Sequence, residues 1–288
     1  MLRKRTAAVA MAQSALMLLS GIALPAMAPP GNQAKAAFDL YADAAEQRIF
    51  IQQDAADGFL DIDQLSPGER TQTLAGLRHG DLLIRRWAPA PPPVPGGLIH
   101  HWIGDVFIPG ASLETLFALL QDYDNLDRYY SPQVTHSRLL ARSGGDFRAA
   151  IRMRQHKVVT IVLDTEYAIH YGRIDPVHAY SFSRSTRISE IENPGTRNEH
   201  ALAPGHDHGF LWQLNSYWRF VQASDGVLVE CEAISLTRDI PAGLNWLIAP
   251  LVESIPRESL AFTLQATRTA GISRHQPVGR VPWPLAIP

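Results

Sequence analysis

The sequence contains a single cysteine, Cys231, among its 288 residues, so no disulfide can form within the chain. The fold therefore depends on a core that needs no covalent cross-link, and 46% hydrophobic residues over this length can supply one. Cys231 shares the apolar side of a strand pattern with Val229 and Ala233. We interpret it as a small buried hydrophobic residue and not as a nucleophile.

The chain also lacks an excess of positive charge. Three of its basic residues, Arg3, Lys4 and Arg5, stand at the N-terminus. Taking these three from the 26 basic residues leaves 23 against 28 acidic residues, a formal charge of −5. Such a surface has no general attraction for nucleic acid or for anionic lipid head groups. We therefore expect no nucleic-acid partner.

Short motifs of common catalytic and cofactor sites are missing as well: the phosphate-binding glycine loop, the nucleophile elbow and the dinucleotide fingerprint. We therefore expect no cofactor. The pairs Glu199-His200 and His206-Asp207-His208 bring carboxylate and imidazole groups together, but their spacing matches no standard zinc pattern. The neighbouring glycines favour an exposed loop, so no metal site is expected.

The first 28 residues have the pattern of a secretory signal peptide: a basic head, an apolar run, and small residues at Ala26-Met27-Ala28. Cleavage is expected between residues 28 and 36, because Pro29 disfavours a cut directly before it. An uncleaved membrane anchor is the alternative, but Gln13 and Ser14 interrupt an apolar run that is short for a span. The pattern favours a periplasmic or secreted protein.

The rest of the chain divides at a proline-rich stretch. Residues 37–87 predict an N-terminal helical appendage, with helices over Phe38–Gln53 and after the capping-box pair Ser66 and Glu69. Residues 88–97 contain five prolines and are predicted to be a linker. Residues 98–271 form the main domain, and residues 272–288 are expected to be a flexible tail.

Period-2 alternation predicts a mainly antiparallel main domain. The expected strands are Leu98–Ile108, Val134–Ala141, Phe147–Gln155, Val158–Tyr171, His178–Ile188, Phe210–Gln222 and Val227–Arg238. Two short helices are expected between Leu113 and Tyr130, and one long helix after Gly243. Pro256 predicts a kink or restart of that helix near Ser254-Ile255. Because a sheet with one apolar face must cover it, we expect the last helix to do so.

This order of elements resembles the helix-grip fold of the START-like (SRPBCC) superfamily, which includes polyketide cyclases and lipid-transfer domains. The resemblance covers about Leu98 to Thr269, and its most specific stretches are Phe107–Gly110, Leu119–Asp124, Tyr129–Val134, Leu214–Arg219, Val229–Ser235 and Glu253–Leu260. It implies an α+β fold in which a curved antiparallel sheet wraps around a long C-terminal helix. The superfamily has no universal catalytic motif to carry over.

Such a fold implies a cavity between the sheet and the last helix. We predict that ligand-binding residues line it; they are Leu163, Tyr167, Tyr180, Phe182, Trp212, Leu214, Trp218, Val229, Cys231, Ala233, Ile255, Ser259, Phe262 and Arg152. Arg152 is included because an inward arginine could hold a ligand carboxylate or phosphate. The alternative places Arg152 on an outer face, paired with acids of the next strand. The carboxylate pairs Asp164/Glu166 and Glu230/Glu232 are interpreted as a solvated outer face.

The functional hypothesis is non-catalytic binding or carriage of one hydrophobic or amphipathic, lipid-like small molecule, which leaves room for transient contact with a membrane. One alternative is a cyclase- or hydrolase-like enzyme, for which Asp105, Glu166, His170 and Arg152 are the first candidates. A second alternative is a protein-interaction module whose cavity is filled by its own side chains.

Overall fold

The computed structural model describes residues 32–54, 58–156, 160–203, 205–239 and 245–275. The predicted signal peptide lies outside these residues. Of the predicted tail over residues 272–288, the first four residues instead continue the last helix, and residues 276–288 lie outside the described residues. The described helices are α2 (Asn32–Asp54), η1 (Asp61–Gln64), α3 (Pro67–His79), α4 (Leu113–Leu120), η2 (Tyr123–Asn125), α5 (Leu126–Tyr129) and α6 (Asn245–His275). The described strands are β1 (Leu83–Arg86), β2 (Gly97–Pro109), β3 (Val134–Ser143), β4 (Asp146–His156), β5 (Thr160–Arg173), β6 (His178–Glu192), β7 (His200–Ala201), β8 (Gln213–Ala223) and β9 (Gly226–Arg238).

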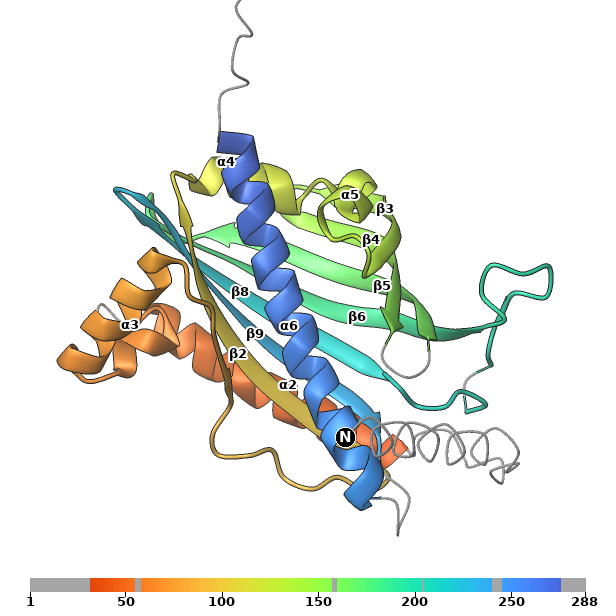
Figure 1. The fold of residues 1–288 in the computed structure, drawn as a ribbon. Coiled ribbons are helices and arrows are strands. Elements are labelled where there is room, and N and C mark those ends of the chain that lie inside the picture. The colour runs from red at the N-terminus through yellow and green to blue at the C-terminus, as the bar shows by residue number, and fades with distance from the viewer. Residues whose placement is uncertain (1–31, 55–57, 157–159, 204, 240–244, 276–288) are drawn as a thin grey trace, which may run out of the picture.

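The strands form one antiparallel sheet in the order β1-β2-β9-β8-β6-β5-β4-β3, and β7 pairs with the end of β6. The first long strand, β2, pairs along its whole length with the last strand, β9, from Gly97 opposite Arg238 to Pro109 opposite Gly226. The sheet curves around α6, which lies across one of its faces (Figure 1). The predicted α+β helix-grip fold, START-like in its order of elements, is therefore confirmed.

The C-terminal half of α6 packs closely on β2. Leu260, Leu264, Thr267 and Gly271 follow one stripe of the helix and are buried. A Cβ atom at Gly104 of β2 would lie 2.5 Å from Cδ1 of Leu264, so only glycine fits beneath the helix at this point. The helix is continuous from Asn245 to His275, and it does not restart near Ser254. Within the described part of the chain, no helix combines the length and apolar content needed to cross a membrane.

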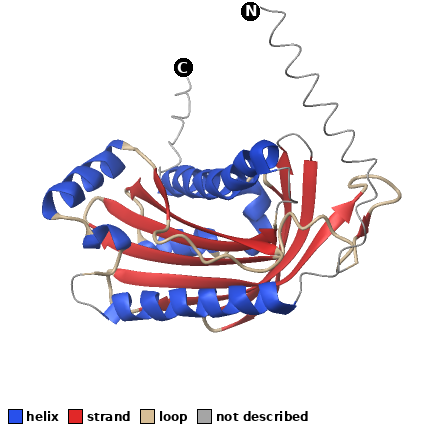
Figure 2. Ribbon diagram, turned by 90° about the horizontal axis from the view of Figure 1, so that it is seen from below, coloured by secondary structure: helices blue, strands red, loops and turns tan. Residues whose placement is uncertain are grey.

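We call the face of the sheet toward α6 the inner face and the opposite face the outer face. The part of the outer face formed by β8 and β9 is covered by α2, so that the two long helices lie on opposite sides of the sheet (Figure 2). The buried side chains of α2 recur at helical spacing; they are Ala34, Phe38, Ala42, Ala45 and Ile49. They pack on Tyr217, Ile234 and Leu236 of the outer face. The stripe explains why α2 lies flat on the sheet.

We call α2, η1, α3 and β1 together the N-terminal segment. Its parts after α2 also pack on the sheet. Ile62 of η1 and Leu77 of α3 pack with Phe107 and Leu228 of the outer face. β1 pairs with β2, from Leu83 opposite Asp105 to Arg86 opposite Trp102, and so becomes an edge strand of the main sheet. The predicted N-terminal appendage is therefore packed against the main domain over its described length.

The close approach at Gly104 gives a first prediction. Gly104→Ala should lower the free energy of unfolding by about 1–3 kcal/mol, because the added methyl group overpacks the contact with Ile84 and Leu264. Urea unfolding followed by tryptophan fluorescence measures this loss. Gly68→Ala in α3 is the matched control: nothing lies within 4 Å of its added Cβ, so stability should be unchanged or slightly raised. Equal stability of the two variants would contradict the close packing of α6 on β2.

Candidate ligand-binding face

Along the middle of β8 the inner face is less completely covered than the outer face, although α6 crosses the inner face. On β8 the inward side chains of Leu214, Ser216 and Trp218 are partly exposed, whereas the intervening outward residues Asn215, Tyr217 and Arg219 are buried. This strand lies in the interior of the sheet, between β6 and β9. The exposure therefore reflects incomplete cover above the sheet and not a free edge.

Three small residues and one tryptophan form a row across the same region. Ser183 of β6, Ser216 of β8, Ala233 of β9 and Trp102 of β2 are consecutive cross-strand neighbours, and all four are partly exposed. We call Trp102, Leu214, Ser216, Trp218 and Ala233 the inner patch. The patch adjoins the fully buried part of the inner core, which includes Val229, Cys231 and Tyr167. Apolar side chains and small hydroxyls thus form an accessible surface in the middle of the sheet.

One flank of α6 borders this core. Phe262 and Ala266 are partly buried and pack against it, and the hydroxyl of Ser259 accepts a hydrogen bond from Nε2 of Gln155 on β4 at 3.2 Å. These residues precede or follow the buried stripe of α6 by one or two positions. The flank is therefore turned away from β2 toward the part of the inner face that α6 covers incompletely.

The polar groups of the buried inner core are tyrosine hydroxyls that pair with one another or with the helix. The hydroxyls of Tyr123 and Tyr171 are 2.9 Å apart, and that of Tyr130 lies 2.8 Å from Oγ1 of Thr267 on α6. Burial raises the pKa of Tyr130 and of Tyr167 to about 12, and it raises the pKa of Tyr171 well above its usual value. At neutral pH these groups are uncharged hydrogen-bond donors and acceptors.

Two surface hollows lie beside the sheet. One, of about 310 Å³, lies between α5 and α6 and is lined by Arg128, Tyr129, Ala266, Thr269, Ala270 and Ser273. The other, of about 520 Å³, is lined by α3 and by Asp81, Leu82 and Leu83. Neither hollow is lined by the residues that the sequence predicts for ligand binding.

The structure brings ten of the fourteen predicted residues to the inner side. Seven are on inward positions of the sheet; they are Leu163, Tyr167, Leu214, Trp218, Val229, Cys231 and Ala233. Ile255, Ser259 and Phe262 lie on α6 and are partly buried. Burial raises the pKa of the Cys231 thiol well above its usual value, which agrees with its interpretation as an inert core residue.

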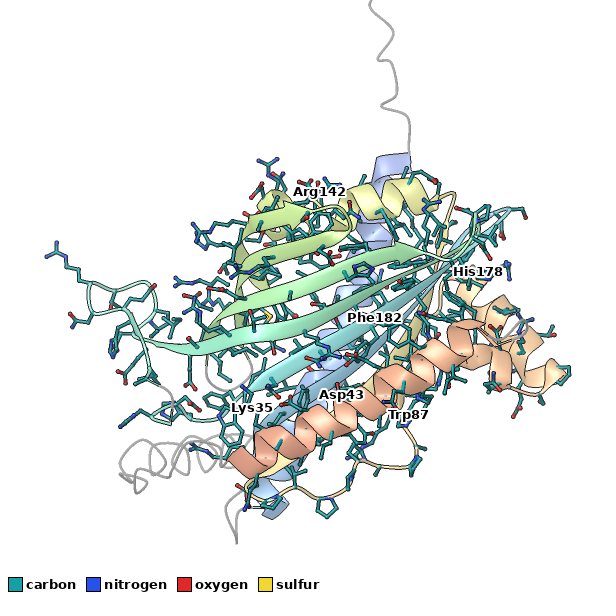
Figure 3. The ribbon with its side chains drawn as sticks, turned by 180° about the vertical axis from the view of Figure 1, so that it is seen from behind. Lys35, Asp43, Trp87, Arg142, His178 and Phe182 are labelled. Atoms are coloured by element: carbon teal, nitrogen blue, oxygen red, sulfur yellow. The ribbon has the colours of Figure 1, made fainter. Side chains whose placement is uncertain are left out.

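Three predicted aromatic residues point elsewhere. Phe182 and Tyr180 lie on the outer face, where Phe182 packs on Tyr217 and on Phe50 of α2 with ring centroids 5.4 and 5.0 Å apart. Trp212 precedes β8, packs with the outer core, and donates from Nε1 to Asp207 at 2.8 Å. The assumption that apolar side chains face α6 fails for Phe182 and Trp212 because α2 contributes to a second apolar core on the outer face. Phe182 and α2 are seen from this side in Figure 3.

Arg152 also lies on the outer face. Its Nε and Nη2 donate to the two carboxylate oxygens of Asp164 at 2.6 and 2.8 Å, and its Nη1 donates to Glu199 at 2.7 Å. These bonds occupy the guanidinium, and the hydrogen bond to Asp164 is the largest cause of its raised pKa. The structure places Arg152 as the alternative interpretation expects, paired with an acid of the next strand.

The remaining catalytic candidates of the sequence share this outward direction. Glu166 pairs with Arg187 at 2.8 Å, and His170 pairs with Asp146 at 2.7 Å on an exposed part of the sheet. Asp105 alternates with the inward residues Gly104 and Val106 and is buried on the outer face. These groups therefore cannot act on a molecule that binds the inner patch. Within the described residues, no cluster of three or more His, Cys, Asp or Glu side chains could hold a metal ion.

Glu230 and Glu232 correct a further expectation. They are 0% exposed, because α2 and η1 cover the face that the sequence predicts to be solvated. Arg219 forms an ion pair with Glu230, and His101 Nε2 lies 2.7 Å from Glu232. Two residues of α2 complete the contact, since Arg48 pairs with Glu232 and the Tyr41 hydroxyl lies 2.8 Å from His101 Nδ1. The sequence carries one signal of this burial: Gly226–Ile234 is almost continuously apolar apart from these two acids, as in strands covered on both faces.

Comparisons with known proteins find similar solved structures at low sequence identity. No protein-family model and no curated protein matches the sequence. Among solved structures, similar ones include a STAR-related lipid transfer protein fragment from Xanthomonas axonopodis, at 19% identity over 65% of this chain and 90% of that one, with a TM-score of 0.43. The Zhui aromatase/cyclase from Streptomyces sp. R1128 shows 14% identity, 63% and 98% coverage, and a TM-score of 0.43. A START superfamily protein from Mycobacterium smegmatis shows 13% identity, 61% and 99% coverage, and a TM-score of 0.40.

The strand order, the pairing of β2 with β9 and the long C-terminal helix give the chain a helix-grip fold with a START-like order of elements. In this chain an N-terminal helix also packs on part of the outer face of the sheet.

The buried ion pair gives a second prediction. Arg219→Ala should lower the free energy of unfolding by about 3–5 kcal/mol, because it leaves Glu230 buried without its partner. Arg187→Ala removes the partner of Glu166 on the same face, but Arg187 is largely exposed, so its loss should cost only about 0–1 kcal/mol. Chemical denaturation of both variants measures the difference. If the two variants lost similar amounts of unfolding free energy, Arg219 would have to be accessible to water, contrary to the structure.

Proposed function

We propose that this protein binds one hydrophobic or amphipathic, lipid-like small molecule at the inner patch, between the sheet and α6. The supporting observation is the partial exposure of Leu214, Trp218 and Ala233 on interior strands of the sheet. A sheet face beneath a packed helix normally buries such side chains. Apolar surface left accessible in this position is a favourable place for an apolar ligand.

Hydrophobic burial would supply most of the binding energy. Removing apolar surface from water contributes about 25 cal/mol per Å², or about 0.8 kcal/mol per methylene group. Ser183 and Ser216 would offer hydroxyls to a polar end of the ligand. A ligand whose buried portion is uncharged suits this surface, because the tyrosines nearby in the inner core remain protonated.

Carriage fits the arrangement better than catalysis does. Asp105, Glu166, His170 and Arg152 project from the outer face, and most of their polar atoms are engaged by neighbouring residues. We therefore propose that the protein binds its ligand without converting it chemically. We also propose that it is exported, on the strength of the N-terminal pattern of charged, apolar and small residues.

Native mass spectrometry tests the proposal directly. The protein, purified without organic solvent, should carry a lipid-like mass that solvent extraction removes, and the extracted protein should take up a fluorescent fatty acid. Absence of both bound mass and uptake would contradict the proposal. Conversion of the bound molecule over time would show that the protein is an enzyme.

A pair of tryptophan variants locates the site. Trp218→Ala should weaken uptake of the fluorescent fatty acid by about tenfold or more, because a large aromatic contact in the inner patch is lost. Trp212→Ala is the matched control: it removes the same side chain from the outer core and should leave uptake within about twofold. Fluorescence titration gives both dissociation constants, and circular dichroism checks that the variants are folded.

The opposite ranking of the two tryptophan variants would place the ligand on the outer side of the sheet. Ala233→Leu provides a gain-of-volume test, because it adds a side chain to the floor of the inner patch without removing a contact. It should weaken uptake as well. Unchanged uptake by both Ala233→Leu and Trp218→Ala would contradict the assignment of the inner patch.

A further inference from the structure

Charged and polar groups meet on the outer face, beneath the N-terminal segment. We call them the outer charge cluster; its members are Arg48, Asp61, Arg85, His101, Asp105, Arg219, Glu230 and Glu232. The five members on the long strands β2, β8 and β9 are at most 1% exposed. These strands also supply most of the inner patch, so each alternates between a ligand-facing side and a charged side. The cluster plays no part in the proposed function.

The long strands leave this cluster unbalanced by themselves. They contribute the acids Asp105, Glu230 and Glu232 but one arginine, Arg219, together with His101. The N-terminal segment supplies the remaining cations: Arg48 pairs with Glu232, and Arg85 pairs with Asp105 at 3.1 Å. Docking of the segment therefore both buries the acids and neutralises part of their charge.

The segment also supplies uncharged partners. Nη1 of Arg219 donates to Oε1 of Gln52 on α2 and to the carbonyl oxygen of Phe59, each at 2.8 Å. The backbone N–H of Asp61 donates to Oε2 of Glu230 at 2.7 Å. Without α2 and η1, these buried groups would need water in place of protein partners.

Two carboxylate oxygens of the cluster, Oδ1 of Asp105 and Oε2 of Glu232, have no hydrogen-bond partner among the described residues even when the segment is docked. Oε1 of Glu230 is held by its ion pair with Nη2 of Arg219. Asp105 and Glu230 are direct cross-strand neighbours. Two adjacent buried carboxylates repel each other when both are ionised, and a proton on either one relieves that repulsion.

We propose that the N-terminal segment is a pH-sensitive cover of the sheet, held by the outer charge cluster and loosened when Asp105 and Glu230 are both ionised. Opening would separate α2 and η1 from β2, β8 and β9 while the rest of the sheet stays folded. Water would then solvate the carboxylates that docking buries. The proposal concerns the outer face and stands independently of ligand binding at the inner patch.

The direction of the pH dependence follows from the carboxyl groups. Burial raises the pKa of Asp105 to about 6 in spite of Arg85, and burial raises the pKa of Glu230 well above its usual value in spite of Arg219. Protons on these groups therefore favour the docked state. Their stabilising contribution is fully present below pH about 4 and is lost as pH rises through about 6 and beyond.

Glu232 acts in the opposite direction. Burial by itself would raise its pKa, but the hydrogen bond and charge of His101 and the charge of Arg48 outweigh that effect, so the pKa is lowered. Its contribution is lost as pH falls below its usual titration range. The groups that face these carboxyls are Arg48 and Tyr41 from α2, Asp61 from η1, Arg85 from β1, His101 from β2 and Arg219 from β8. Docking should therefore be strongest in mildly acidic solution.

Hydrogen exchange measured by mass spectrometry on the full chain tests this cover. Between pH 5 and pH 7, after correction for intrinsic exchange, the opening constant of peptides from α2 should rise about tenfold or more. Asp105 alone would supply about a tenfold rise over that interval, given its raised pKa. Peptides from β5 and β6 report on the sheet itself, and their protection should change less.

Two carboxyl variants identify the groups responsible. Asp105→Asn and Glu230→Gln should each reduce the rise in opening between pH 5 and pH 7, and the double variant should abolish it. Glu166→Gln changes a partly exposed carboxylate farther along the outer face and should leave the rise as in the unaltered chain. Since the pH series on the unaltered chain needs no substitution, the proposal can be tested even where a variant fails to fold.

Three results would overturn the proposal. One is an α2 opening constant that does not change between pH 5 and pH 7. Another is a parallel loss of protection in α2, β5 and β6, which would mean global unfolding. The third is a rise of equal size in the unaltered chain and in both cluster variants, which would assign the titration to other groups.

Discussion

Cover on both faces is the constraint on which the central strands β2, β9 and β8 depend. α6 lies over one side and α2 with η1 lies over the other. A polar side chain on a strand covered on both faces must find its partners inside the protein, because an unpaired buried polar group costs about 1–3 kcal/mol and a charge costs more. Arg219, 1% exposed on an interior strand, meets this requirement by bonding to Glu230, Gln52 and the carbonyl of Phe59.

This constraint explains why the N-terminal segment is integral to the fold. Strands β8 and β9 carry polar residues at Arg219, Glu230 and Glu232. In the sequence alone, this pattern is typical of a strand face that is exposed to solvent. α2 makes apolar and polar contacts with this face. Phe38 and Ile49 pack in the apolar core, and Arg48 forms an ion pair with Glu232. The apolar contacts supply most of the packing, and the polar ones fix where along the sheet α2 lies.

Sequence patterns were sufficient for the long strands, the main helices and the fold. Period-2 alternation located the long strands, and Ser66 with Glu69 marked the start of α3, where the capping box is present. The long loop between β6 and β8 contains the short strand β7, which has too few residues for a pattern to reveal. The buried face of α6 was harder to predict. Its buried stripe, Leu260 to Gly271, does not include the predicted lining residues Ile255, Ser259 and Phe262, because close packing at Gly104 selects another helix face.

Only part of the candidate site could be predicted, because the face that a helix covers cannot be read from one strand. Alternation along a strand says which residues share a face, but it does not say which face a helix covers. The assumption that an apolar face meets α6 places Leu214, Trp218 and Ala233 on the inner side. Phe182 and Tyr180 satisfy the same assumption and yet lie on the outer face, where Phe182 packs on Phe50 of α2 and Tyr180 packs on Phe182. The sheet has an apolar partner on each face, α6 on the inner side and α2 on the outer side. Which strand residues each helix contacts is decided by packing between segments far apart in the sequence.

The two faces therefore divide the physical roles of the sheet. The buried ion pairs of Arg219, Glu230 and Glu232 lie on the outer face, at the part that α2 and η1 shield from water. The inner face keeps hydroxyls and apolar side chains beneath a helix that covers it incompletely. A molecule entering from the inner side meets no buried carboxylate that it must neutralise. Its affinity would depend mainly on the apolar area that it buries. The acids on the other side of the same strands would instead control the docking of the N-terminal segment.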